Sequence, residues 1–199
     1  PETSCSLDAD CAGVGGATIV EQTVSTTCWG MDRLPSLHHG QSFTAPATET
    51  LGRLDMALQS NGPGLVFAIF EGAGFDGTEL HRQTVSSPHG SGSVTPMVAY
   101  PLDGEVNLVA GQVYTIGLAL AGAGSGGFCG NTADVYDGGS TYFNGNAWTP
   151  QDATFRLVGI GRTSGAGAGG GRVCLGTVEQ NLPAPTLSEV RFIGNFVPL

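Results

Sequence analysis

Short runs of β-branched and aromatic residues recur along the chain, separated by glycine, proline, asparagine and aspartate. In residues 54–58 apolar and polar positions alternate, which is typical of an antiparallel strand with one buried face. Residues 113–120 are apolar on both faces toward their end, which predicts a central strand. The chain has no sustained helical spacing of apolar residues. The pattern therefore predicts an all-β sandwich or barrel, with strands at residues 18–26, 41–44, 51–58, 65–70, 79–85, 97–100, 106–109, 113–120, 141–143, 154–160 and 190–197.

Turn-forming residues lie between these runs. Asp-Gly and Asn-Gly pairs supply the positive φ angles that tight hairpins need. The predicted turns are at Asn61–Gly64, Asp76-Gly77, Asp103-Gly104, Asp137–Gly139 and Asn144-Gly145.

Composition divides the chain into three parts. Residues 1–40 are expected to form an N-terminal arm or strand that holds three of the cysteines. Residues 41–161 have the densest strand pattern and are expected to form the compact sandwich. Residues 162–199 begin with a Gly/Ala-rich, linker-like tract and end in a strand-like segment, a possible donor strand.

The charge balance excludes some classes of partner. The 199 residues include 17 acids and 7 bases, all arginine, for a net charge of −10. Without clustered basic residues, binding to nucleic acid is not expected. No apolar run approaches the ~18 residues of a membrane span, so none is expected. The hydrophobic share of 40% is enough for a packed core.

The N-terminus and the cysteines suggest an extracellular or cell-surface location. The chain begins at Pro1 with no initiator Met, which is expected of a mature protein whose signal peptide has been removed. No C-x2-C pair is present, so zinc is not expected. The disulfide candidates are Cys5, Cys11, Cys28, Cys129 and Cys174. Two bridges among them leave one thiol unpaired, and the sequence does not choose the pairing.

Four stretches carry a resemblance to a known type of domain. They are residues 41–46, residues 66–72 followed by 77–80, residues 108–116, and residues 138–142 with Trp148 and 152–157. They are similar to a bacterial secreted jelly-roll domain of surface and adhesin-type proteins, related in architecture to carbohydrate-binding modules. The resemblance implies an all-β jelly-roll β-sandwich with N- and C-terminal extension strands. It is poorly specific for function.

Enzymatic activity is not expected. No G-x-S-x-G nucleophile motif lies at a strand–helix turn. His38 and His39 are adjacent, so on a strand they point to opposite faces and cannot chelate together. His81 and His89 flank a turn-rich segment, where solvated histidines are the simpler interpretation. No cofactor is expected apart from Ca²⁺, for which the candidate ligands are Asp134 and Asp137, although Asp-Gly is also ordinary turn chemistry.

Two functional hypotheses remain. The first is an extracellular structural or adhesive protein, a fibre subunit that joins identical subunits by β-strand exchange. Its assembly strand would contain Val190, Phe192, Ile193, Phe196, Val197 and Leu199. The alternative is a carbohydrate-binding module in which Tyr136, Tyr142 and Trp148 stack on sugar rings. Its partners would be glycans or other surface proteins.

Overall fold

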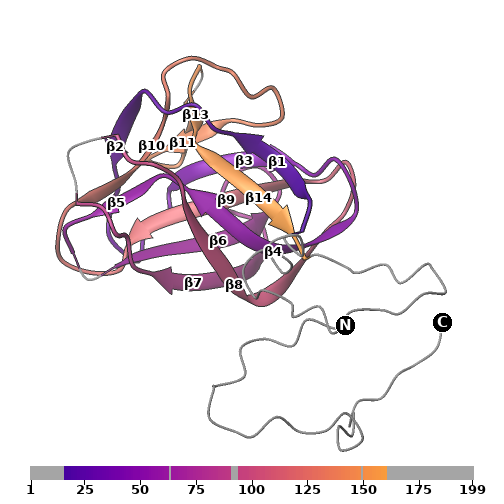
Figure 1. Cartoon of the computed structure of the whole chain (residues 1–199), viewed down its shortest axis with the longest axis horizontal. Coiled ribbons are helices and arrows are strands. Elements are labelled where there is room, and N and C mark those ends of the chain that lie inside the picture. Colours follow the sequence, from indigo (N-terminus) through magenta and orange to yellow (C-terminus); the bar gives the residue numbers. More distant parts are fainter. Residues whose placement is uncertain (1–15, 63, 91–93, 149, 161–199) are drawn as a thin grey trace, which may run out of the picture. The chain divides into compact units, whose positions relative to one another are not determined.

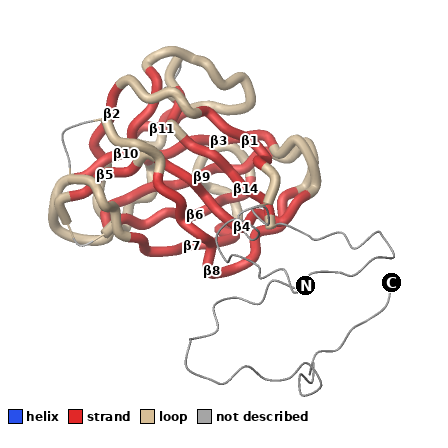
Figure 2. Tube along the Cα trace, in the orientation of Figure 1, coloured by secondary structure: helices blue, strands red, loops and turns tan. Residues whose placement is uncertain are grey.

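A computed structural model describes residues 16–62, 64–90, 94–148 and 150–160. In this part of the chain every regular element is a strand, and loops and turns join the strands (Figure 2). The prediction of an all-β fold is confirmed. No helix among the described residues is long and apolar enough to cross a membrane.

Two antiparallel sheets lie face to face in a β-sandwich-like arrangement (Figure 1). Sheet A has the order β1–β14–β4–β8, and its strands are β1 (Thr18–Gln22), β4 (Glu49–Met56), β8 (Val98–Leu108) and β14 (Phe155–Gly159). Sheet C has the order β12–β11–β3–β9–β6–β7, and its strands are β3 (His39–Thr44), β6 (Leu65–Glu71), β7 (Glu79–Val85), β9 (Val113–Leu120), β11 (Thr141–Phe143) and β12 (Asn146–Ala147). Neither of these sheets closes on itself within the described residues.

A third sheet, sheet B, lies at one end of the sandwich. It has the order β13–β10–β2, and β5 also pairs with β10. Its strands are β2 (Thr27–Gly30), β5 (Leu58–Ser60), β10 (Gly126–Asn131) and β13 (Asp152–Ala153). Strands β4 and β14 diverge at this end, and β10 fills the gap between them. The Cys129 N–H donates to the Ala57 carbonyl, and the Cys129 carbonyl accepts from the Thr154 N–H, both at 2.8 Å.

The main core lies between sheets A and C. Because side chains alternate along each strand, every strand places one row of apolar side chains inside. Rings from the two sheets meet there: the centroids of Phe67 in β6 and Tyr100 in β8 are 6.5 Å apart. The fully buried side chains include Phe43, Leu54 and Phe155. A smaller cluster covers the other face of sheet C and consists of Leu37, Val66, Ala68, Phe70 and Ala119, packed against Phe75 and Ala121.

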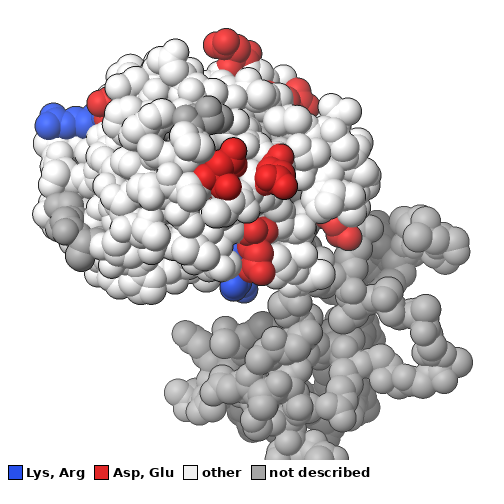
Figure 3. Space-filling view, turned by 90° about the horizontal axis from the view of Figure 1, so that it is seen from above, with Lys and Arg blue, Asp and Glu red and all other residues white. Residues whose placement is uncertain are grey.

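The outer face of sheet A has a row of ion pairs instead of an apolar surface. Arg156 of β14 contacts Glu21 of β1 at 2.6 Å and Asp55 of β4 at 3.7 Å, and Arg53 contacts Asp55 at 2.7 Å. In the view of Figure 3 the acidic side chains lie in separate groups rather than in one patch. The acidic charge therefore does not form one concentrated patch on the face seen from above in Figure 3.

One predicted turn is wrong. Asp103-Gly104 was expected to separate two strands, but it lies inside β8. Strand β8 stays paired with β4 on both sides of a register shift, with Leu51 opposite Val106 and Arg53 opposite Pro101. Between these pairs residues 102–105 of β8 stand opposite Gly52 alone, so the ladder is irregular here but the strand does not end.

Strand β10 was not predicted, because three of its six residues are glycines and glycine usually marks turns. Here the glycines permit close packing. A Cβ at Gly127 would lie 2.0 Å from the Trp29 carbonyl oxygen, and one at Gly130 would lie 2.1 Å from the Asp152 carbonyl oxygen. Strands β1 and β2 fall within the range expected to form an N-terminal arm, and they pair with β14 and β10. The predicted strand at residues 190–197 lies outside the described residues.

Candidate functional site

The feature best suited to binding is an aromatic cluster at the end of the sandwich where sheets B and C meet. Trp148 lies 5.9 Å from Trp29 and 5.1 Å from Phe143, measured between ring centroids. Trp29 packs on Phe128 at 5.3 Å, and Phe143 packs on His39 at 4.6 Å. Phe128 and His39 are buried, whereas Trp148 is 37% exposed. The cluster therefore extends from the core to the surface and ends at Trp148.

A tight hairpin positions Trp148. Strands β11 and β12 are joined through Asn144 and Gly145, whose φ angles of 51° and 80° confirm the predicted Asn-Gly turn. The Gly145 N–H donates to the His38 carbonyl at 2.8 Å, which fixes the turn against the segment before β3. The Trp148 N–H donates to the Thr141 carbonyl at 2.7 Å. These two bonds hold the hairpin and its tryptophan in place.

A disulfide positions Trp29. Cys28 of β2 and Cys129 of β10 are directly opposite in the antiparallel ladder and are bonded to each other. The next pair in the ladder is Trp29 with Phe128. The Trp29 ring lies over Gly130, where a Cβ would be 2.6 Å from the ring edge. The bridge and the glycine together hold this indole against the sheet. Cys5, Cys11 and Cys174 lie outside the described residues.

His39 forms the base of the cluster and is 1% exposed. Its Nε2 lies 3.3 Å from a carboxylate oxygen of Asp32, whose side chain is 60% exposed. Its Nδ1 is buried and has no hydrogen-bond partner among the described residues. Asp32 therefore links the buried imidazole to solvent beside the aromatic rings.

A buried polar network holds the neighbouring loop, residues 132–140. One carboxylate oxygen of Asp152 accepts from the N–H groups of Val135 and Tyr136 at 2.7 and 2.8 Å. Its other oxygen accepts from the Gln41 amide at 3.3 Å. Burial raises the pKa of Asp152 and these hydrogen bonds lower it, with a net increase to which the Asp134 charge also contributes. Since Asp152 and Gln41 are both fully buried, this network has a structural role.

The three predicted sugar-binding aromatics belong to three different ring contacts. Tyr136 packs against Phe155 at 5.3 Å, and burial raises the pKa of its hydroxyl. Tyr142 packs against Phe75 at 5.3 Å and is 9% exposed. Of the three, only Trp148 is in the cluster described above, and binding by the predicted set stays a prediction.

The tryptophan that the sequence analysis missed is Trp29. Its position after Cys28, a disulfide candidate, is the signal that could have identified it.

The remaining candidates lie elsewhere. Asp134 and Asp137 are both exposed in the loop between β10 and β11. No three His, Cys, Asp or Glu side chains come together as a metal would require, within the part of the chain that the structure describes. Calcium binding therefore stays a prediction. His81 contacts Asp103 at 3.4 Å between β7 and β8. Residues 190–199, which contain the predicted assembly strand, are not described.

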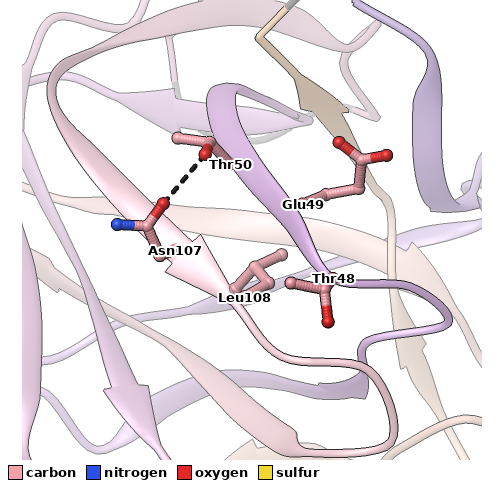
Figure 4. A pocket seen from close by; sticks show the side chains of 5 residues that line it. All are labelled: Thr48, Glu49, Thr50, Asn107 and Leu108. Atoms are coloured by element: carbon pink, nitrogen blue, oxygen red, sulfur yellow. Dashed lines mark hydrogen bonds between the residues drawn. The ribbon is translucent and has the colours of Figure 1, made fainter. Parts of the chain in front are cut away.

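Two further depressions in the surface of the described residues lie near the β8–β9 turn. One, of about 240 Å³, is lined by Thr48, Glu49, Thr50, Asn107 and Leu108 (Figure 4). In it the Thr50 hydroxyl donates to the Asn107 side-chain oxygen at 2.8 Å. The other, of about 360 Å³, adjoins Glu71 and Tyr114. Both lack the exposed aromatic rings that distinguish the cluster around Trp148.

No protein-family model matches the sequence of this chain, and no curated protein matches it.

Proposed function

We propose that this protein binds glycans through the exposed end of its aromatic cluster, with Trp148 as the main stacking surface and Trp29 and Phe143 beside it. The exposure of Trp148 on a rigidly held hairpin carries the proposal. The C–H groups on one face of a pyranose ring pack well on an aromatic face, and an amphipathic indole suits such a half-wet surface. Because the rings are fixed before binding, little side-chain entropy is lost when a ligand docks.

The order of the strands supports a jelly-roll architecture for this domain. Numbering β1, β3, β4, β6, β7, β8, β9 and β14 from 1 to 8 in chain order gives 1-8-3-6 for sheet A and 2-7-4-5 for sheet C, whose short strands β11 and β12 add beyond β3 and are not numbered. This order arises when a long antiparallel ribbon is wrapped into two facing sheets, as in a jelly roll.

The Cys28–Cys129 bridge supports an extracellular location, because such bonds persist in oxidising compartments.

The geometry and the charge also restrict the glycan. The ring planes of Trp29 and Phe143 are inclined to that of Trp148 by 62° and 51°, so the three rings cannot lie flat on one crystalline surface. A net charge of −10 disfavours uronate or sulfated polymers by repulsion. We therefore expect binding to single, uncharged oligosaccharide chains.

The test is titration calorimetry of the full chain with cellohexaose, mannohexaose and chitohexaose, repeated with Trp148→Ala. We expect binding to at least one of them, weakened at least tenfold by the substitution, which corresponds to about 1.4 kcal/mol. Trp148→Phe keeps an aromatic face and should retain part of the affinity.

Tyr142→Phe is the matched control, because Tyr142 lies in a different ring contact and its ring is kept. Its affinity should equal that of the wild type. Unchanged binding by a folded Trp148→Ala variant, or no binding to any soluble oligosaccharide, would contradict the proposal.

The other hypothesis, a structural or adhesive fibre subunit linked by strand exchange, stays a prediction. Its assembly strand lies in residues outside the structural description.

A further inference from the structure

We propose that Asp32 is the hydrogen-bond acceptor of the glycan site and that the buried His39 holds its carboxylate in position for a sugar hydroxyl. This inference rests on the proposed function, because it names the polar group that would complete the contact made by Trp148. Aromatic rings supply contact area, whereas a small number of fixed polar groups determine the orientation and the identity of a ligand.

The main chain around Asp32 is fixed against the end of β9. The Leu120 N–H donates to the Asp32 carbonyl at 2.8 Å, and the Leu34 N–H donates to the Leu120 carbonyl at 3.0 Å. His39 pairs with Leu118 in the same part of β9. One stretch of β9 therefore places Asp32 and His39 beside each other.

His39 fixes the orientation of the Asp32 carboxylate. Its Nε2 lies 3.3 Å from one carboxylate oxygen, whereas its Nδ1 is buried and has no hydrogen-bond partner among the described residues. A hydrogen carried only on Nδ1 would be unpaired, and it would leave the Nε2 lone pair facing the carboxylate oxygen. We therefore place a hydrogen on Nε2, which donates to Asp32. Because the imidazole is buried and packs edge-on against Phe143, it has little freedom to move.

The other carboxylate oxygen of Asp32 is free to accept from a ligand. The Asp32 side chain is 60% exposed, and no arginine among the described residues forms an ion pair with it. The hydrogen bond from His39 is the only one that its side chain makes within this part of the chain. A carboxylate that accepts and does not donate is complementary to the hydrogen of a sugar hydroxyl.

Asp32 lies near the stacking surface through a continuous series of contacts. The carboxylate contacts His39, whose ring packs on Phe143 at 4.6 Å between centroids. The Phe143 ring in turn packs on Trp148 at 5.1 Å. An oligosaccharide with one ring stacked on Trp148 can therefore extend toward the carboxylate. A hydrogen bond to a charged acceptor is roughly twice as strong as one between neutral groups, so this contact would add affinity as well as direction.

This acceptor restricts the glycans that the site can take. A sugar with a free hydroxyl at this position donates to Asp32. An O-methyl or O-acyl group at the same position has no hydrogen to donate and would leave the carboxylate unpaired. We therefore expect the site to prefer neutral oligosaccharides with free hydroxyls over their O-methylated or O-acylated forms.

The experiment is titration calorimetry of the full chain with cellohexaose, mannohexaose and chitohexaose, using the wild type, Asp32→Ala, Asp32→Asn and Glu105→Gln. We expect Asp32→Ala to weaken binding at least tenfold. Asp32→Asn should weaken it less, because the amide oxygen still accepts from His39 but carries no charge. Glu105→Gln is the matched control, since it removes one exposed negative charge from β8, outside the aromatic cluster, and its affinity should equal that of the wild type.

A second measurement separates direct contact with the sugar from an effect on the fold. The O-methylated form of the tightest-binding hexaose has no hydroxyl hydrogens, so the wild type and Asp32→Ala should bind it equally weakly. His39→Phe keeps a ring against Phe143 but removes the bond to Asp32. In this background Asp32→Ala should cause a smaller loss of affinity for the free hexaose than it does in the wild type, because the carboxylate is no longer held.

Two results would overturn the role of Asp32 and leave the glycan site standing. The first is equal affinity of the wild type and Asp32→Ala, together with loss of binding by Trp148→Ala. The second is a tenfold difference between the wild type and Asp32→Ala that persists with the O-methylated hexaose. Absence of binding by the wild type to all three oligosaccharides would contradict the proposed function, and this inference with it.

Discussion

Loss of the Cys28–Cys129 disulfide should strongly destabilise the domain. The bridge joins residues separated by 101 positions and so closes a loop that contains most of the sandwich. In the chain-entropy model a loop of about 100 residues contributes about 4.7 kcal/mol, because the bridge restricts the unfolded chain. Three of the six residues of β10 are glycines, so side-chain packing of this strand can replace little of the stability that the bridge contributes. We expect Cys28→Ala/Cys129→Ala to lower the free energy of unfolding by about 3–5 kcal/mol.

The assay is urea unfolding followed by tryptophan fluorescence. Both tryptophans, Trp29 and Trp148, lie in the aromatic cluster, so the signal reports directly on the region that the bridge holds. A domain stability is typically about 5–15 kcal/mol, so a loss of this size moves the midpoint far outside experimental error.

The control retains the bridge and replaces Cys5, Cys11 and Cys174 with alanine, which removes any thiol that could exchange with it. This control should unfold at the same urea concentration as the wild type if only the Cys28–Cys129 bridge is structural. A loss below about 1 kcal/mol in the double variant would refute the entropic argument, since it lies outside the usual effect of removing a native disulfide.

Two further predictions concern buried polar groups. Asp152→Asn should lower the free energy of unfolding by about 1–3 kcal/mol in urea titrations, because the new side-chain NH₂ group would face the NH₂ group of Gln41. The Gln41 amide cannot flip to relieve this contact, since its oxygen already accepts hydrogen bonds from Thr141 and Ala153. Equal stability of the variant and the wild type would contradict this prediction. Burial raises the pKa of Tyr100 to about 12. The neutral phenol is therefore favoured in the fold, and its contribution is complete below pH 10 and lost as the pH rises toward 12, by about 2 kcal/mol. Tyr100→Phe should lack this part of the alkaline loss in unfolding titrations from pH 9 to 12, and an identical pH profile for the two proteins would count against the assignment.

The alternation of apolar and polar residues was sufficient to predict the all-β fold and most of the long strands. Residues 113–120 were predicted to form a central strand because they are apolar on both faces toward their end, and as β9 they lie between β3 and β6. The Asn144-Gly145 turn was also predictable, because positive φ angles at adjacent residues favour this pair.

Other features depend on residues far apart in the chain, and only the tertiary structure decided them. Glycines in β10 resemble a loop in sequence, but they allow that strand to fit between Ala57 and Thr154, which are nearly a hundred residues apart. Asp103-Gly104 resembles a hairpin turn, but pairing with β4 continues through it. The candidate site has the same origin. Trp29 and Trp148 meet because the Cys28–Cys129 bridge and the β11–β12 hairpin place them at one end of the sandwich, and no local pattern encodes a contact between such distant residues.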